Sequence, residues 1–377
     1  MSEVYAGAVD RGLEGVIACT TAISSIVDTT LCFRGYTIED LAENSNFEEV
    51  VFLLWNNRLP KADELASFCA ELSKDMGLDA ELVKQLQALP TKDVHPMAWL
   101  RTGCSMLALW DKEAQGETEQ AQKNVAMRLT ARMGTLVALF ERTRQGKAYV
   151  APKADKSLAW NFLYMMTGEE PDADTVRVFD VCLILHADHE LNCSAFSARV
   201  TSSSLSDIYS AVTSAIGALK GPLHGGANEQ VMRMLKEIGT VDGATKWVRE
   251  ALDQKKKVMG FGHRVYKNGD PRAKILSGMS QMMTKKTNQA HWFEMSKVIH
   301  DTVEREKGLL PNVDFYSATV YYSLGIPLDL YTPIFAVSRV SGWLAHIFEQ
   351  YANNRIYRPR GQWTGNEGLK WVPASDR

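Results

Sequence analysis

The residues of this sequence that could take part in catalysis or binding are histidines in three settings, one aspartate and several arginines. The first setting is His186-Ala187-Asp188-His189-Glu190, where two histidines three residues apart would share one face of a helix. Such a pair could contribute to a metal site, but zinc needs further converging ligands, and no HExxH motif or cysteine cluster supplies them. The alternative is two core histidines satisfied by hydrogen bonds, and the residues alone leave both interpretations open.

The second setting is a glycine-rich loop, Gly221-Pro222-Leu223-His224-Gly225-Gly226, between two predicted helices. The glycines let backbone or ligand approach the imidazole closely. A loop histidine before a helix N-terminus tends to stay neutral, because the positive end of the helix dipole disfavours imidazolium. A neutral imidazole N–H is a donor that could stabilise an enolate oxygen. The alternative is that His224 only caps the turn.

The third setting, Gly260-Phe261-Gly262-His263-Arg264, lies in a basic segment. Residues 255–274 hold seven Lys or Arg and one acidic residue, Asp270. Cationic side chains and glycine N–H groups suit phosphates. The dinucleotide fingerprint GxGxxG is not formed, because Val265 stands at the position of its third glycine. The alternative for the lysine run 255–257 is a solvated helix end.

One aspartate and one arginine have apolar neighbours in the sequence. If Asp314, in Pro311-Asn312-Val313-Asp314-Phe315, is desolvated, its pKa rises and it could serve as a general base near neutral pH. A helix N-cap role explains the same position. Arg339 lies in an apolar helical segment, where an unpaired guanidinium is costly, so it needs an anionic partner. That partner could be a carboxylate side chain or a ligand.

The elements that must position these residues are mainly helical. Apolar residues at helical spacing predict a helix over 205–221, ended by Gly221-Pro222, and strand-like alternation is rare and short. Asn46 and Asn228 are predicted N-caps, the first with Glu49 in a capping box. We therefore expect an all-α protein. Its other predicted helices are 174–185, 228–238 and one starting at Phe47, and its predicted connections are 111–123 and 152–157.

Length and composition limit the class of protein. The chain has 377 residues, enough for two or three domains, and its 45% hydrophobic and 23% charged residues exclude a disordered or fibrous protein. The longest apolar run, 50–55, is far shorter than the roughly 18 residues of a membrane helix. The net charge of −3 gives no overall attraction to nucleic acid or an anionic membrane. Six scattered cysteines and a start without a secretory pattern predict a cytoplasmic protein.

Taken together, the motifs resemble those of citrate synthase along nearly the whole chain. They occur in the family's order: GLEGV (12–16), FRGYTIEDL (33–41), HADHE (186–190), GPLHGGAN (221–228), GFGHRVYKNGDPR (260–272), PNVDFYSA (311–318), FAVSRVSGWLAHIFEQ (335–350) and NNRIYRPR (353–360). The resemblance implies an acyltransferase that condenses acetyl-CoA with oxaloacetate and hydrolyses citryl-CoA to citrate and CoA. It implies no metal and no other cofactor.

The resemblance also implies an architecture and a set of site residues. The architecture is a homodimer of two-domain helical subunits, with a large domain at 1–225 and 326–377 and a small mobile domain at 226–325. The implied catalytic residues are Asp314 as base toward the acetyl methyl, His224 as donor to the thioester oxygen and His263 as acid toward the ketone oxygen. Oxaloacetate would be held by His189, Arg272, Arg339 and, from the other subunit, Arg358. The CoA side would be lined by Lys257, Val258, Met259, Gly260, Phe261, Arg264 and Lys267.

Three alternatives differ from this interpretation. A 2-methylcitrate synthase, which uses propionyl-CoA, shares almost every motif, since one methyl group in a pocket is worth only about 1–3 kcal/mol. The residues of the GFGHRVYK and FAVSRVSGWLAHIFEQ motifs favour citrate synthase. A non-catalytic helical protein that binds CoA or nucleic acid through 255–274 would leave His224, Asp314 and Arg339 without a purpose. A metalloenzyme built on His186 and His189 would need further ligands.

Overall fold

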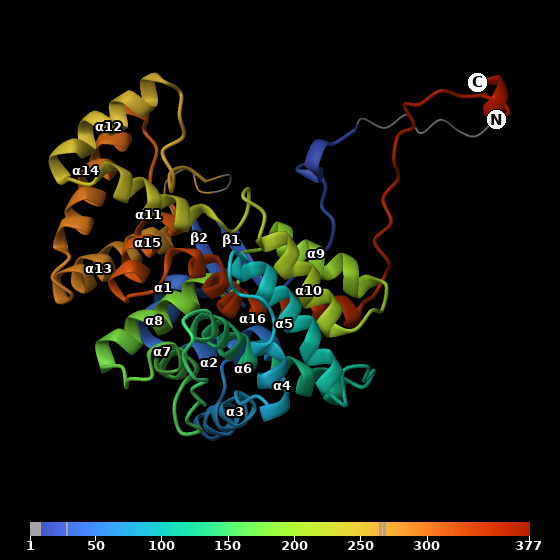
Figure 1. The fold of residues 1–377 in the computed structure, drawn as a ribbon, viewed down its shortest axis with the longest axis horizontal. Helices are drawn as coiled ribbons and strands as arrows, with labels where there is room; N and C mark the ends of the chain where they lie inside the picture. The colour runs from blue at the N-terminus through green and yellow to red at the C-terminus, as the bar shows by residue number, and fades with distance from the viewer. Residues whose placement is uncertain (1–8, 28, 264–265, 267–268) are drawn as a thin grey trace.

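The chain is described by a computed structural model that covers residues 9–27, 29–263, 266 and 269–377. Figure 1 shows a helical body from which the two ends of the chain project together. In chain order the helices are α1 (Ile38–Asn44), α2 (Phe47–Asn56), α3 (Ala62–Asp75), α4 (Ala80–Gln87), α5 (Pro96–Trp110), α6 (Glu119–Arg144), α7 (Leu158–Thr167), α8 (Ala173–His186), α9 (Cys193–Ser203), α10 (Ile208–Leu219), α11 (Ala227–Ile238), α12 (Val241–Asp253), α13 (Pro271–Lys286), α14 (Ala290–Lys307), α15 (Val313–Ser323) and α16 (Tyr331–Ala352).

The predicted all-α class is confirmed. Strands β1 (Ser24–Val27), β2 (Thr30–Phe33) and β3 (Tyr36–Thr37) form one small antiparallel sheet in the order β1-β2-β3. Short 3₁₀ turns occur at Arg11–Leu13, Leu328–Leu330 and Ala374–Asp376. Within the described residues, no helix is both long enough and apolar enough to span a membrane.

Local sequence signals set most helix boundaries as predicted. Helices α8, α10 and α11 match the predicted 174–185, 205–221 and 228–238, and the Asn46 side chain accepts from the Glu49 N–H at 2.9 Å to cap α2. Two details of the prediction are wrong. Gly226 is the N-cap of α11, so Asn228 lies inside the helix, and α6 begins at Glu119, which limits the connection before it to 111–118.

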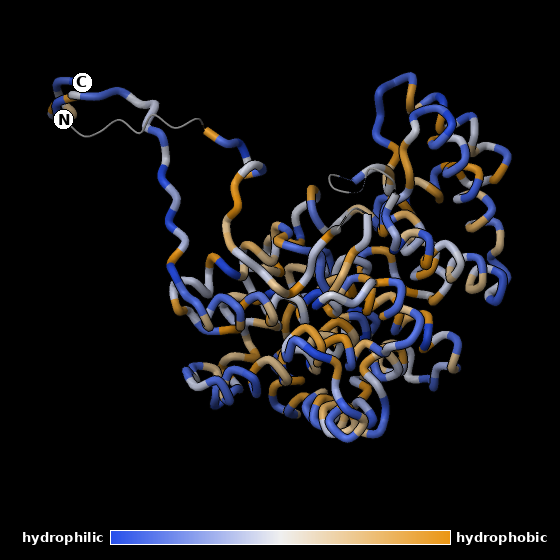
Figure 2. The backbone as a smooth tube through the Cα atoms, turned by 180° about the vertical axis from the view of Figure 1, so that it is seen from behind, coloured by the Kyte–Doolittle hydropathy of each residue, from blue (hydrophilic) through white to orange (hydrophobic). Residues whose placement is uncertain are grey.

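Helix α16 runs through the middle of the body and organises the packing around it. Every residue from Tyr331 to Ile347 is buried, as expected for a helix that is apolar on all sides. It packs against α2, α6, α8, α9 and α10 (Figure 1). Figure 2, coloured by hydropathy, shows hydrophobic segments inside the body and hydrophilic segments along its outer turns. A polar group on α16 therefore faces protein rather than water.

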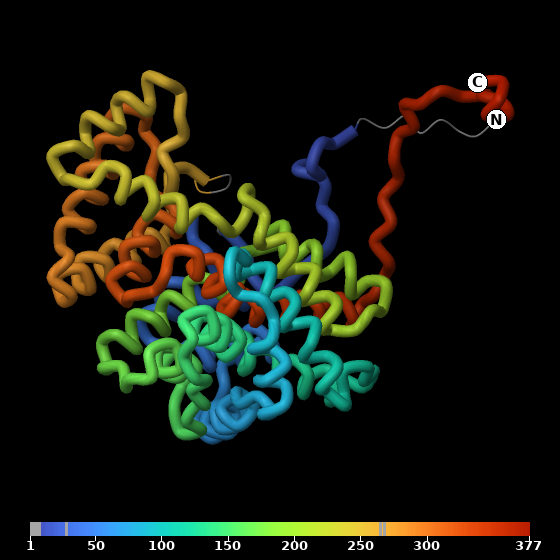
Figure 3. Tube along the Cα trace, viewed as in Figure 1, coloured from blue at the N-terminus to red at the C-terminus, as the bar shows by residue number. Residues whose placement is uncertain are grey.

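Helices α11 to α15 form a lobe on one side of this body. Helix α13 packs on α15 and α12 on α14, while α1 and α8 contact α13 and join the lobe to the body. Figure 3 shows the lobe from gold to orange and, on the opposite side, the two ends of the chain extending away from the body. The extended ends expose Ile17, Trp363 and Trp371.

Close packing between α16 and the turn after α8 depends on one glycine. A Cβ atom at Gly342 would collide with the carbonyl oxygen of Ala187 and lie 2.5 Å from Asp188 Oδ1. Both neighbours are fully buried, and one of the colliding atoms belongs to the backbone, so neither can move cheaply.

We expect Gly342→Ala to destabilise the protein by about 2 kcal/mol or more, because the added methyl group forces α16 away from this turn. Urea unfolding followed by circular dichroism would measure the loss. Gly278→Ala, on the exposed side of α13, is the matched control, since its Cβ would meet nothing within 4 Å. The control should be neutral or slightly stabilising. An unchanged urea midpoint for Gly342→Ala would contradict the packing argument.

Candidate active site

The turn that follows α8 brings two of the predicted residues into different surroundings. His186 is buried, its Nδ1 lies 2.7 Å from the Cys182 carbonyl oxygen, and its own carbonyl accepts from Arg339 Nε at 2.6 Å. His189 instead places Nε2 at 3.1 Å from the Tyr266 hydroxyl. Within the described part of the chain, no group of three or more His, Cys, Asp or Glu residues is arranged to hold a metal ion. His186 and His189 therefore make separate hydrogen bonds and do not act as a pair.

A buried aspartate fixes this turn. Asp188 is fully buried and accepts from the Ser24 hydroxyl at 2.5 Å, and its Oδ2 lies 3.4 Å from His346 Nε2 on α16. The Ser24 oxygen in turn accepts from the Glu190 N–H at 2.8 Å. Strand β1 and helix α16 thus hold the turn that carries His189.

The loop that carries His263 is held against the start of α15. The Gly262 N–H donates to the Leu310 carbonyl at 3.0 Å, and the Asn312 N–H donates to the Gly260 carbonyl at 2.9 Å. Gly260 has φ +82°, and a Cβ atom there would lie 2.8 Å from Val231 and 2.9 Å from Phe315, so only glycine fits. This pairing fixes the loop before His263 beside the helix that carries Asp314.

Asp270 connects two helix starts and one guanidinium. Its Oδ1 accepts from the N–H and Nε of Arg272 at 3.0 and 2.9 Å, and its Oδ2 accepts from Arg272 Nη2 at 2.8 Å and from the Val313 N–H at 3.0 Å. Arg272 is held rigidly at the start of α13 and is nearly inaccessible to solvent. Among the described residues, Asp270 is the acceptor for the Arg272 side chain, and Nη1 of Arg272 is left for a further anion.

Arg339 is the second buried guanidinium of the cluster. Its Nε is bound to the His186 carbonyl, its guanidinium carbon lies 4.7 Å from the centre of the Phe335 ring, and the residue is 1% exposed. Among the described residues, neither of its terminal nitrogens has a protein acceptor. Burial lowers the pKa of Arg339 to about 10, and the charge of Asp188 opposes that shift. A buried cation with free N–H groups is suited to bind an anion.

His189, His224 and His263 lie around these cations. The ring centres of His189 and His263 lie 5.1 Å apart, and that of Tyr266 lies 4.6 Å from His263. Burial lowers the pKa of His189 and His263 below the usual range, and the charge of Arg272 lowers both further. Burial, followed by the charge of Arg339, lowers the pKa of His224 to about 4. Near pH 7 these imidazoles are therefore neutral.

The tautomer of His224 follows from a helix start. Its Nε2 accepts from the Ser194 N–H at 3.2 Å, in the first turn of α9, where backbone N–H groups have no partner within the helix. The Ser194 hydroxyl also lies 2.8 Å from Nε2 and accepts from Trp343 Nε1 at 3.0 Å. The donation from the Ser194 backbone N–H to Nε2 favours the neutral tautomer with its proton on Nδ1, whereas the Ser194 hydroxyl donates its own proton to Asn192 Oδ1 at 2.8 Å. His224 therefore offers one N–H donor on the side of the ring away from α9.

Asp314 supplies the carboxylate of the cluster. Asn312 is the N-cap of α15, since its side chain accepts from the Asp314 N–H at 3.0 Å, so the alternative of Asp314 as the cap is wrong. Burial raises the pKa of Asp314 to about 6, although the charges of Arg272 and Arg339 oppose the rise. A carboxylate with this pKa is mostly ionised at neutral pH and is a stronger base than an ordinary aspartate.

Not all predicted residues join this cluster. Arg358 is exposed at the start of the C-terminal extension and lines a separate cavity of about 740 Å³, together with Arg199 and Glu349. Of the predicted CoA residues, Lys257 is exposed, Val258 and Gly260 are buried, and Met259 and Phe261 are half-buried. Arg264 and Lys267 lie outside the described residues.

Residues 12–360 match the family profile described as "Citrate synthase, C-terminal domain". The chain belongs to the citrate synthase family. A curated relative, "Citrate synthase 2" of Bacillus subtilis, is 55% identical and is matched over 97% of this chain and 99% of its own length. "2-Methylcitrate synthase 1" of Corynebacterium glutamicum is 42% identical over 98% of each chain.

Solved citrate synthase structures share the whole fold. The enzyme from Thermoplasma acidophilum, described in a ternary complex with carboxymethyl coenzyme A and oxaloacetate, has a TM-score of 0.92. It is 32% identical to this chain and is covered over 100% of its length, against 98% of this chain. This family member is therefore a helical transferase of the acyltransferase type.

The citrate synthase motifs did not reveal every partner in the site. Tyr266, Asp270, Ser194 and Trp343 contact the predicted residues or their partners, yet none of them was predicted from the sequence to have a role in the site. Asp270 is the one with a readable signal, because an acidic residue directly before Pro271 at a helix start predicts an N-cap. Ser194 and Trp343 had no such signal, since their contacts with His224 and with each other join distant parts of the chain.

Proposed function

We propose that this citrate synthase condenses acetyl-CoA with oxaloacetate and hydrolyses citryl-CoA to citrate and CoA. The observation that carries the proposal is the pair of buried guanidiniums, Arg272 and Arg339, beside Asp314, whose pKa burial raises to about 6. Two cations suit the two carboxylates of oxaloacetate. The reaction needs no metal or other cofactor, and we infer a cytoplasmic location.

The proposed roles divide the reaction into two proton transfers. Asp314 removes a proton from the acetyl methyl group while the Nδ1–H of His224 donates to the thioester oxygen. The resulting enolate, hydrogen-bonded to His224, attacks the ketone carbon of oxaloacetate, and His263 donates a proton to the ketone oxygen as the new C–C bond forms. Water then cleaves the thioester and releases CoA.

The proton on the acetyl methyl is far less acidic than a carboxyl group, so Asp314 cannot remove it unaided. One preorganised donor such as His224 contributes about 3–4 kcal/mol toward stabilising the enolate oxygen. Proximity to the bound oxaloacetate and exclusion of water supply much of the rest. The half-buried positions of Asp314 and His224, beside the buried Arg272 and Arg339, support this division.

Substrate binding is proposed to use both the body and the lobe of α11 to α15. His189 and Arg339 come from the body and Arg272 from the lobe of α11 to α15, so oxaloacetate would bridge them. Lys257, Val258, Met259, Gly260, Phe261, Arg264 and Lys267 would line the CoA side. We infer that residues 226–325 form a small domain that closes over the substrates against a large domain of 1–225 and 326–377, because closure keeps water from the thioester before condensation.

A homodimer is proposed to complete the site. Ile17, Trp363 and Trp371 are 91, 69 and 79% exposed on the extended chain ends, and exposed apolar surface of this kind marks interaction sites. Arg358 lies at the base of the same extension, apart from the cluster of its own chain. A second copy bound to these ends would receive Arg358 as a further cation for oxaloacetate.

Propionyl-CoA is the alternative substrate. The relative named 2-methylcitrate synthase is 42% identical to this chain, and one additional methyl group changes binding by only about 1–3 kcal/mol. Thiol release should be measured with acetyl-CoA and with propionyl-CoA, each with and without oxaloacetate. We expect release that depends on oxaloacetate and a higher kcat/KM for acetyl-CoA. A higher value for propionyl-CoA would identify a 2-methylcitrate synthase, and no release from either would refute the proposal.

Asp314→Asn should lower kcat at least about a hundredfold, because the amide cannot accept the proton. In the unmodified enzyme, kcat/KM for acetyl-CoA should fall as the pH drops through about 6, since protonated Asp314 is inactive. The residual activity of the variant should lack this dependence. Asp301→Asn, on the half-exposed surface of α14, is the matched control and should keep both turnover and pH profile. Near-normal turnover of Asp314→Asn would remove this residue from the role of base.

Mixed dimers test whether Arg358 acts across subunits. An Arg358→Ala chain and an Asp314→Asn chain, carrying different affinity tags, should each be nearly inactive alone. Purified heterodimers should regain activity, because one of their sites combines an intact Asp314 with an intact Arg358 from the partner. Heterodimers that stay as inactive as both parents would show that each site is built within one subunit.

A further inference from the structure

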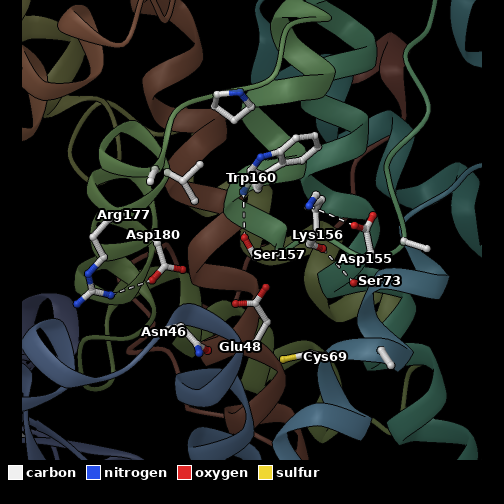
Figure 4. A pocket seen from close by; sticks show the side chains of 15 residues that line it. Asn46, Glu48, Cys69, Ser73, Asp155, Lys156, Ser157, Trp160, Arg177 and Asp180 are labelled. Atoms are coloured by element: carbon white, nitrogen blue, oxygen red, sulfur yellow. Dashed lines mark hydrogen bonds and ion pairs between the residues drawn. The ribbon is translucent and has the colours of Figure 1, made fainter.

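A second cavity lies in the body, away from the active-site residues. It has a volume of about 770 Å³, is open to solvent and is lined by α2, α3, α7, α8 and the loop before α7. Figure 4 shows Glu48 and Asp180 on its floor, Trp160 above them and Lys156 with Asp155 at its side. The remaining wall is largely apolar and includes Ala70, Ala154, Pro171, Ala173 and Val176. A mostly apolar cavity with a few converging polar groups is typical of a small-molecule site.

The charges around this cavity leave one carboxylate without a cation. Arg177 pairs with Asp180 Oδ2 at 3.2 Å, and Lys156 Nζ pairs with Asp155 Oδ2 at 3.2 Å. The Arg177 guanidinium also donates to the Ser45 and Glu43 carbonyls at 2.7 and 2.9 Å, which keeps it on the Asp180 side. Among the described residues, no lysine or arginine forms an ion pair with Glu48.

Glu48 is nevertheless almost fully buried. It is 3% exposed, and its Oε1 accepts from the Leu158 N–H at 2.7 Å, at the start of α7. Burial raises the pKa of Glu48, and burial together with the charge of Glu48 raises the pKa of Asp180 to about 7. Both carboxyl groups are therefore costly to ionise, and a cation between them and the aromatic wall would stabilise the ionised pair.

On the wall opposite the carboxylates, the Trp160 ring already has two lysine cations beside it. Lys153 Nζ and Lys156 Nζ lie 5.3 and 5.7 Å from the centre of the Trp160 ring, within the range of a cation–π interaction. The same ring presents apolar area to the cavity. One ligand type uses all of these features, namely a positively charged head on an apolar body.

We propose that the cavity between α2, α3, α7 and α8 binds a small organic cation, such as an arylalkyl ammonium ion, with its charge against Glu48 and its apolar body against Trp160. The site is distinct from the catalytic cluster, because the residues that line it include none of the proposed substrate-binding or catalytic residues. Helix α8 nonetheless belongs to both, since Asp180 faces the cavity and the same helix ends at His186.

Isothermal titration of the full chain with 2-phenylethylammonium and with its neutral counterpart 2-phenylethanol tests this site. The ammonium ion should bind at least about tenfold more tightly, the difference expected of a charge-assisted hydrogen bond to a buried carboxylate. In Glu48→Gln the two affinities should agree within about twofold, because the amide keeps the acceptor for Leu158 N–H but loses the charge. Equal affinities in the unmodified protein would overturn the proposal and leave the carboxylates as helix-start acceptors only.

Three further variants keep the result interpretable. Asp155→Asn removes the same charge from the cavity side and should change the affinity for the ammonium ion by less than about twofold, since that carboxylate is exposed and paired with Lys156. Asp314→Asn should bind the probe normally, and loss of binding there would place the probe in the active site and refute the proposal. If Glu48→Gln fails to fold, Trp160→Leu replaces it and should lower the affinity for the ammonium ion. An unchanged affinity in Trp160→Leu would refute the proposal.

Discussion

The buried guanidinium of Arg339 is the constraint on which much of this structure depends. Helix α16 is enclosed by other helices, so this side chain cannot reach water and must be stabilised inside the protein. The His186 carbonyl and the charge of Asp188 do part of this work, and both come from the turn after α8. Breaking a buried charge from its partners costs about 3–5 kcal/mol. The close approach of α16 to that turn, permitted by Gly342, is therefore an electrostatic as well as a packing requirement.

Burial and the same cations set the protonation of the site. Burial is the main cause that lowers the pKa values of His189, His224 and His263, and the charge of Arg272, Arg339 or both lowers each of them further, so these rings act as neutral donors and acceptors at physiological pH. For Asp314 burial and the arginines act in opposite directions, and burial dominates. The result is a carboxylate more basic than an ordinary aspartate, close to two buried cations. Neither property could be adjusted without changing the other.

The site is assembled from two parts of the molecule. His189, His224 and Arg339 belong to the body or its edge, whereas His263, Arg272 and Asp314 belong to the lobe of α11 to α15. The contact of His189 with Tyr266 joins the two parts, and Asp270 ties α13 to α15 within the lobe. A substrate with two carboxylates would be held by both parts, which links its binding to their relative position.

Local sequence determined the helices and most of their caps, and it suggested the candidate site residues. Helical periodicity, Asn46 as a cap and the Gly221-Pro222 stop depend on neighbours a few residues apart, so they could be predicted, as could the family from its ordered motifs. Tertiary structure alone decided the rest, because it depends on groups far apart in the chain. The donation from the Ser194 N–H to His224 is one such contact, and the raised pKa of Asp314 follows from its burial, which outweighs the charges of two arginines on other helices. The separation of Arg358 from the cluster follows from its place on the exposed C-terminal extension. The effect of Glu48 on the pKa of Asp180 has the same cause, since burial and charge are properties of the folded chain and not of any segment.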